Sequence, residues 1–226
     1  MRTTVSVTFM LAGIVFAACL ILSNILATKI MMIGPWSAPA GVLIFPLAYI
    51  INDVIAEVWG YQKARLIIWA GFGVNILAAL FITLAIAAPA APFWQNQDAF
   101  ATTLGSTSRI VAASLMAYLL GSFLNAYVMS RFKVMTRGKN FSLRAIVSTL
   151  AGEGADSLIF ITVAFAGVFP VSVMLTMILT QALIKTVYEI LVLPLTIVIV
   201  NKVKKLEGID TYDYNISYNP FRLKQV

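Results

Sequence analysis

The side chains of this sequence that are most able to bind or react lie inside long apolar stretches. These stretches contain five of the nine acidic residues and one lysine, namely Asp53, Glu57, Glu153, Asp156, Glu189 and Lys185. A charged side chain at the centre of a membrane helix costs about 2.5–3.5 kcal/mol on the insertion scale. We therefore expect these groups to face the inside of a helix bundle, paired or protonated, where an ionisable side chain marks a functional site by default.

The spacing of the acidic residues places them on shared helix faces. Asp53 and Glu57 are four residues apart, and Glu153 and Asp156 are three apart, so each pair lies on one side of a helix. Two neighbouring carboxylates could accept hydrogen bonds from a ligand, carry a proton, or act as a general acid and base.

A third polar face contains the lysine. Lys185 and Glu189 are four residues apart and could form an ion pair within one helix, and Gln181 extends the same face by one turn. Weaker stripes at the same spacing comprise Asn24 and Thr28 in one stretch, and Ser114, Tyr118, Gly121 and Asn125 in another. Another stretch has only Asn75 near its middle, which indicates mainly a scaffold. Tyr49 and Tyr118 lie deep enough in their stretches to stack on a flat ring.

The composition indicates a membrane protein. Hydrophobic residues make up 61% of the 226 residues, charged residues 11%, and the mean hydropathy is +0.93. A soluble domain has about 45–50% apolar and 25% charged residues. There is no histidine and only one cysteine, which excludes an intrachain disulfide and leaves Ser-His-Asp catalysis without a required part. We predict no metal and no cofactor.

Apolar runs predict six spanning helices in an all-α bundle, with boundaries near Val7–Ile33, Val42–Trp59, Ala64–Ala88, Arg109–Ser130, Leu143–Val168 and Val171–Val200. Gly34-Pro35 and Pro39 are expected to end the first helix. Residues 89–108 are expected to form a longer loop, and residues 131–140 a short basic one.

The basic residues set the predicted orientation. Six spans put both termini on one side, which then carries thirteen of the 16 lysines and arginines. The positive-inside rule places that side in the cytoplasm. Because the same topology explains the net charge of +7, nucleic acid is not an expected partner. Residues 1–201 are predicted to form the membrane domain, and residues 202–226 a cytoplasmic tail that folds against the loops.

Residues 45–61 carry the clearest family motif, Phe-Pro-Leu-Ala-Tyr-x-x-Asn-Asp-x-x-Ala-Glu-Val-Trp-Gly-Tyr. Three later segments agree with it, Arg-x4-Ser-Leu-x-Ala-Tyr-x-x-Gly at 109–121, Ser-Thr-x-x-Gly-x3-Asp-Ser at 148–157 and Lys-x-x-Tyr-Glu-x4-Pro-Leu at 185–195. Together they resemble the queuosine precursor transporter family, also called the vitamin uptake transporter group. Asn125 and Glu153 depart from the family pattern, in which Asp and Gln are expected.

The resemblance implies a multi-pass protein of the bacterial inner membrane that imports 7-deazaguanine bases, the cyano and aminomethyl precursors of queuosine, for tRNA modification. A carboxylate can accept a bidentate pair of hydrogen bonds from the N–H groups of a guanine-like edge. We expect Asp156 or Glu153 to accept from the base and Asn125 and Lys185 to donate to it. Asp53 and Glu57 would complete the pocket or carry a proton, and the predicted site also includes Gln181, Glu189, Tyr49 and Tyr118.

Two other readings remain open at this point. One is the substrate-binding S-component of an energy-coupling factor vitamin importer, which is also a six-helix protein and needs separate ATPase partners. The other is an intramembrane enzyme that uses Asp53/Glu57 or Glu153/Asp156 as acid and base. The Gly-x-Gly-Asp motif of presenilin-like proteases is missing from the sequence, so we expect no enzyme activity. The expected partners are a purine-like molecule and the lipid bilayer, and a homo-oligomer stays open.

Overall fold

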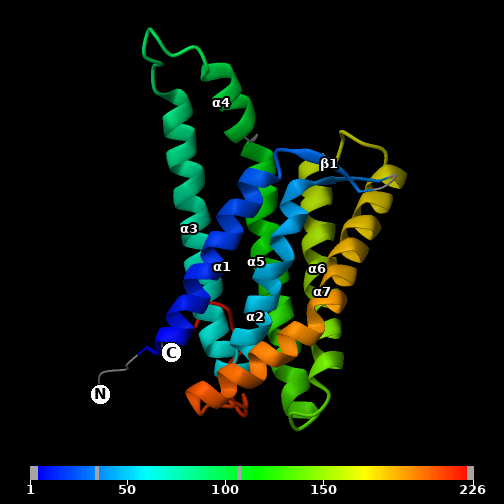
Figure 1. The fold of residues 1–226 in the computed structure, drawn as a ribbon. Coiled ribbons are helices and arrows are strands. Elements are labelled where there is room, and N and C mark those ends of the chain that lie inside the picture. The colour runs from blue at the N-terminus through cyan, green and yellow to red at the C-terminus, as the bar shows by residue number, and fades with distance from the viewer. Residues whose placement is uncertain (1–4, 34–35, 106–107, 223–226) are drawn as a thin grey trace.

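The computed structural model describes residues 5–33, 36–105 and 108–222 and consists mainly of helices (Figure 1). The long helices are α1 (Val7–Leu26), α2 (Phe45–Trp59), α3 (Tyr61–Ala87), α5 (Ser108–Met135), α6 (Phe141–Phe165) and α7 (Val171–Glu207). Six segments are long and apolar enough to cross a membrane. This confirms the predicted all-α bundle of six spanning helices.

The first helix is shorter than predicted. It ends at Leu26, and the chain then forms a short antiparallel ribbon of β1 (Ile30–Ile33) and β2 (Trp36–Pro39), with Met31 opposite Ala38. Hydropathy does not predict the end of the helix at Leu26. The residues that follow form strands, but they are apolar like those of the helix, so hydropathy alone does not separate the two. Gly34-Pro35, the predicted helix stop, lies outside the described residues. A 3₁₀ turn, η1 (Ala40–Leu43), leads from the ribbon into α2.

Other boundaries also move. The predicted loop 89–108 contains the short helix α4 (Gln97–Leu104), and the Gln97 amide donates to the Ile86 carbonyl at 2.8 Å. Helices α5 and α7 both run past the predicted spans, to Met135 and Glu207. Their basic last turns lower the hydropathy without ending the helix, because lysine and arginine are good helix formers. Gly208, with φ +64°, ends α7.

The bundle has two ends, a hairpin end and a tail end. The hairpin end carries the β1–β2 ribbon, and the tail end carries the C-terminal segment 208–222 (Figure 1). At the tail end Gly60, with φ +82°, makes the sharp turn between α2 and α3, a conformation that glycine adopts at least cost.

Helix α2 is the centre of the bundle. It packs against α1, α3, α5 and α7, and twelve of its 15 residues are buried. Polar groups on α2 must therefore find partners inside the protein.

Helix α7 bends on its way to the tail end. Pro194 lies inside this helix, and Figure 1 shows the later part of α7, in orange, turning across the tail end of the bundle. A proline inside a helix removes one backbone hydrogen bond and kinks the axis. The bend brings the Lys204 ammonium to 2.6 Å from the Glu57 carboxylate on α2.

The C-terminal segment is docked on the bundle. Asp213 accepts hydrogen bonds from the Tyr61 backbone N–H, at 2.8 Å, and from the Ser130 hydroxyl. Arg65 and Trp69 on α3 donate to backbone carbonyls of the same segment, at 2.8 Å each. The segment therefore covers the tail end of α3 and α5.

Helices α5 and α6 cross closely at two glycines. A Cβ added to Gly152 would lie 2.6 Å from the Asn125 Cβ and 2.9 Å from the Gly121 carbonyl oxygen. The absence of side chains here allows the two backbones to approach, as is common between membrane helices. The crossing holds the polar residues of α5 and α6 in register.

We predict that Gly152→Ala lowers the stability by about 1–3 kcal/mol, because overpacking between two backbones is hard to relieve. Gly154→Ala is the matched control, since a Cβ at Gly154 meets nothing within 4 Å. There alanine should be neutral or stabilising, because it favours helix more than glycine does. Thermal unfolding of the two purified variants in detergent measures the difference. Equal melting temperatures would contradict the close crossing.

Candidate functional site

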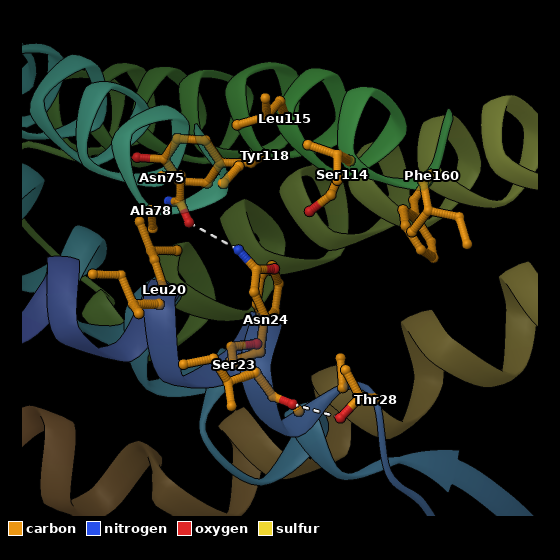
Figure 2. Close-up of a pocket in the computed structure, with 18 of the residues that line it drawn as sticks. Leu20, Ser23, Asn24, Thr28, Asn75, Ala78, Ser114, Leu115, Tyr118 and Phe160 are labelled. Carbon is orange, nitrogen blue, oxygen red and sulfur yellow. Dashed lines mark hydrogen bonds between the residues drawn. The ribbon is translucent and has the colours of Figure 1, made fainter. Parts of the chain in front are cut away.

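A cavity of about 400 Å³ lies between α1, α3, α5, α6 and α7 (Figure 2). Its lining reaches the hairpin end at Thr28, Leu104 and Gly105. Ligand pockets for small molecules usually measure about 300–1,000 Å³, so this cavity has room for a single heterocycle.

One wall of the pocket is an amide pair from α1 and α3. Figure 2 shows Asn24 and Asn75 pointing toward each other, and the Asn24 side-chain amide donates to the Asn75 side-chain oxygen at 2.8 Å. Asn75 in turn donates to the Gly71 carbonyl at 3.0 Å. Asn24 lines the pocket, and its side-chain oxygen accepts no hydrogen bond from the described residues. The third predicted span therefore contributes to the pocket, although its sequence indicated mainly a scaffold.

The opposite wall is charged and comes from α6 and α7. The Lys185 ammonium lies 2.6 Å from Asp156 and 2.6 Å from Glu153, which is one turn away on α6. It also lies 4.2 Å from the centre of the Phe45 ring. The sequence suggested an ion pair between Lys185 and Glu189 on the same helix. In the structure Lys185 instead pairs with the two carboxylates of α6. Asp156 uses one oxygen, Oδ2, for Lys185, and Oδ1 has no donor among the described residues.

Two further side chains shape the pocket beside this wall. Gln181 lines it, and among the described residues its buried oxygen has no hydrogen-bond partner. The Tyr118 hydroxyl donates to the Ile68 carbonyl at 2.8 Å. Tyr118 lines the pocket with its hydroxyl already engaged, so what it can offer a flat ligand is its aromatic ring.

A buried polar layer follows on the tail side of the pocket. Asn52 donates to the Asn125 side-chain oxygen at 2.8 Å, and the Ser148 hydroxyl donates to Asp53 at 3.5 Å. The carboxyl groups of Asp53 on α2 and Glu189 on α7 lie within electrostatic range of each other. None of these residues lines the pocket.

Glu57 belongs to a separate group of charges at the tail end. Its carboxylate lies 2.8 Å from Arg144, 2.6 Å from Lys204 and 3.6 Å from Lys133. Asp210 completes this Glu57 cluster by contacting both lysines. Partial burial raises the pKa of Asp210, but the hydrogen bonds and charges of the two lysines outweigh it and hold the pKa below its ordinary value.

The structure thus separates the predicted site residues into three groups. Those that line the pocket are Asp156, Gln181, Lys185 and Tyr118. Those buried outside its lining are Asp53, Asn125, Glu153, Glu189 and Tyr49. Glu57 lies in the tail-end cluster instead. The ring of Tyr49 fills the α5–α6 crossing beside Gly152.

Several residues that line the pocket are not among the predicted site residues. They are Asn24, Thr28, Asn75, Ser114, Phe45 and Phe160. The polar ones were visible as helix-spaced stripes or as a lone mid-span amide, but that signal equally fits a simple bond between helices.

The geometry gives little support to acid–base catalysis by the predicted pairs. Asp53 and Glu57 are neighbours in sequence but contact different partners, and Glu153 and Asp156 are both held by one lysine. Among the described residues there is no group of three or more histidine, cysteine or acidic side chains placed to hold a metal ion. The arrangement fits reversible binding of a polar ring.

Comparison with known proteins gives independent evidence of the family of this chain. The family model described as "Putative vitamin uptake transporter" matches residues 39–199. The chain is similar to the "Probable queuosine precursor transporter" of Bacillus subtilis (strain 168), with 26% identity over 173 residues and 76% of each chain covered. It is also similar to the "Queuosine precursor transporter" of Escherichia coli (strain K12), with 32% identity over 126 residues, 55% of this chain and 54% of that protein. No solved structure gives a significant match.

Proposed function

This chain belongs to the vitamin uptake transporter family, and on that basis we propose that it imports 7-deazaguanine precursors of queuosine across the bacterial inner membrane. Both relatives named above are queuosine precursor transporters by name. The chain is a multi-pass membrane protein with a central pocket, which is the architecture that such transport requires.

The observation that carries the substrate class is the Asp156–Lys185 wall. A deazaguanine presents adjacent N–H donors on one edge and a carbonyl acceptor beside them. Asp156 Oδ1 can accept from that edge, and the Lys185 ammonium can donate to the carbonyl. The ring of Tyr118 supports a flat base.

The charge distribution supports an orientation for this pocket. The tail end carries most of the basic residues, so we place it in the cytoplasm. The pocket lining reaches the hairpin end, which then faces outward. The buried polar layer and the Glu57 cluster would then lie between the pocket and the cytoplasm, and we infer a state that is closed on the cytoplasmic side.

The decisive experiment is uptake by the purified chain alone in liposomes. Radiolabelled cyano-deazaguanine should enter without ATP or any second protein, and unlabelled aminomethyl-deazaguanine should compete with it. Adenine and riboflavin should compete far less, because they lack the guanine-like edge. The label should be recovered chemically unchanged.

Three results of the uptake experiment would contradict the proposed function. Uptake that needs an ATPase partner would favour the S-component alternative, and a chemically altered product would favour an enzyme. Efficient competition by riboflavin with none by the deazaguanines would replace the substrate class.

A further inference from the structure

The carboxyl groups of Asp53 and Glu189 form a pair without a basic partner. Asp53 is fully buried and Glu189 is 3% exposed. Asp53 lies on α2 and Glu189 on α7, two helices that pack against each other, and each carboxyl group lies within electrostatic range of the other. Oδ2 of Asp53 has no hydrogen-bond partner among the described residues.

The groups around the pair leave its charge uncompensated. Asn125 faces Asp53 from α5 and Thr149 faces Glu189 from α6, and both are neutral. The charged groups in range, Glu57 toward Asp53 and Glu153 toward Glu189, are themselves acidic.

The basic residues of neighbouring helices are engaged elsewhere. Lys185, one turn before Glu189, is held by Glu153 and Asp156 on α6. Lys63 on α3 lies over the Phe9 ring, and Arg65 on α3 bonds the tail. Helix α1 contains no charged residue.

Two neighbouring carboxylates in a low-dielectric interior do not both stay ionised, because like charges repel and neither is hydrated. A proton held between the two oxygens removes the repulsion and needs no added space. A metal cation would need several further oxygen ligands around it. A proton needs no ligand beyond the two carboxyl groups themselves, whereas sodium would also draw on neighbouring oxygens such as those of Ser148 and Thr149.

The pair lies one helical turn from the pocket wall on one helix and one turn from the Glu57 cluster on the other. On α2, Asp53 is one turn before Glu57, and on α7, Glu189 is one turn after Lys185. One helical turn spans about 5.4 Å. The pair thus stands between the pocket wall and the Glu57 cluster.

We propose that Asp53 and Glu189 form a proton-binding site that couples substrate import to proton entry. One proton binds the pair from outside when the substrate enters the pocket, and both are released inside. This rests on the proposed function and extends it to the driving force. The hypothesis from the sequence joined Asp53 with Glu57 as the candidate proton carriers, whereas the tertiary contacts join it with Glu189.

The test uses the full chain in liposomes that contain a pH-sensitive dye, with the membrane potential clamped at zero. Wild type should acidify the interior when deazaguanine is added outside. An imposed gradient of one pH unit, acid outside, should support about tenfold accumulation of the base, the equilibrium ratio for one proton per substrate. Asp53→Asn and Glu189→Gln should abolish accumulation and acidification but keep exchange of internal for external base. Asp98→Asn, an exposed carboxylate in α4, is the matched control.

The outcomes separate the coupling from the function. No exchange of the base by wild type would overturn the proposed function and the coupling with it. Exchange without a pH change, or accumulation driven by a sodium gradient, would overturn the coupling alone. Acidification that persists in both variants would overturn the assignment to this pair. If Asp53→Asn does not fold, Glu189→Gln carries the same test from the other helix.

Discussion

Replacing Asp156 with asparagine is expected to weaken deazaguanine binding by about tenfold to a hundredfold, since a hydrogen bond to a charged group contributes about 1.5–3 kcal/mol. The substitution keeps the shape of the side chain but places an N–H₂ group among its acceptor positions. It also removes one of the two carboxylates that hold Lys185 at 2.6 Å. Binding is measured by thermal-shift titration of the purified protein, because a ligand that binds only the folded form raises its apparent stability.

The control for this prediction is Asp98→Asn. Asp98 is exposed in the first turn of α4, so the same change of side chain there should leave binding unchanged. Near-normal binding and uptake in a well-folded Asp156→Asn protein would remove Asp156 from the centre of the site.

Glu57→Gln is expected to lower the free energy of unfolding by about 3–5 kcal/mol, because removing one partner leaves the remaining buried charges uncompensated. Glu57 is the carboxylate shared by Arg144, Lys133 and Lys204. Arg144 is fully buried and Lys133 is 2% exposed, so water cannot replace the lost carboxylate for them. Thermal or urea unfolding in detergent measures the effect, and poor expression at 37 °C would agree with it.

The same substitution at Glu207 provides the comparison. Glu207 is half-buried at the last position of α7, and glutamine there should change stability by less than about 0.5 kcal/mol, as is usual for surface sites. Similar stability of the two variants would show that Asp210 or water takes over the role of Glu57.

The two predictions concern residues that the sequence alone does not distinguish. Both are carboxylates inside apolar helices, at equal cost in a membrane. The fold places Asp156 in the pocket wall and Glu57 among basic side chains at the tail end. We therefore expect a loss of binding from one and a loss of stability from the other.

Much of the fold follows from the sequence. Apolar runs of membrane length predict the six spanning helices, because backbone groups in lipid must bond within their own helix. The ribbon after α1 and the short helix α4 are not predicted, since both occur near helix ends where hydropathy carries no periodic signal. The full length of α7 is missed for a related reason, as its basic last turns stay helical beyond the apolar stretch.

The candidate site is predicted only in part. The cost of intramembrane charge correctly directs attention to the polar residues of α6 and α7, and helix spacing correctly puts Gln181 and Lys185 on one face. The spacing of residues within one helix cannot predict which helix supplies the ion-pair partner of Lys185. Lys185 could have paired with Glu189 on its own helix, but the close α5–α6 crossing and the packing of α7 bring it Glu153 and Asp156.

The sequence by itself therefore determined that this is a six-helix membrane protein with charged groups that must be sheltered from lipid. It also determined which faces of the helices carry them, because helical periodicity is a local property of the chain. Only the tertiary structure decided which carboxylates belong to the pocket wall, which to the Glu57 cluster at the tail end, and which, like Asp53 and Glu189, lie beside each other without a basic partner. That division depends on contacts between α2, α6 and α7. These helices lie far apart in the sequence, so the spacing of residues within one helix carries no information about the contacts between them.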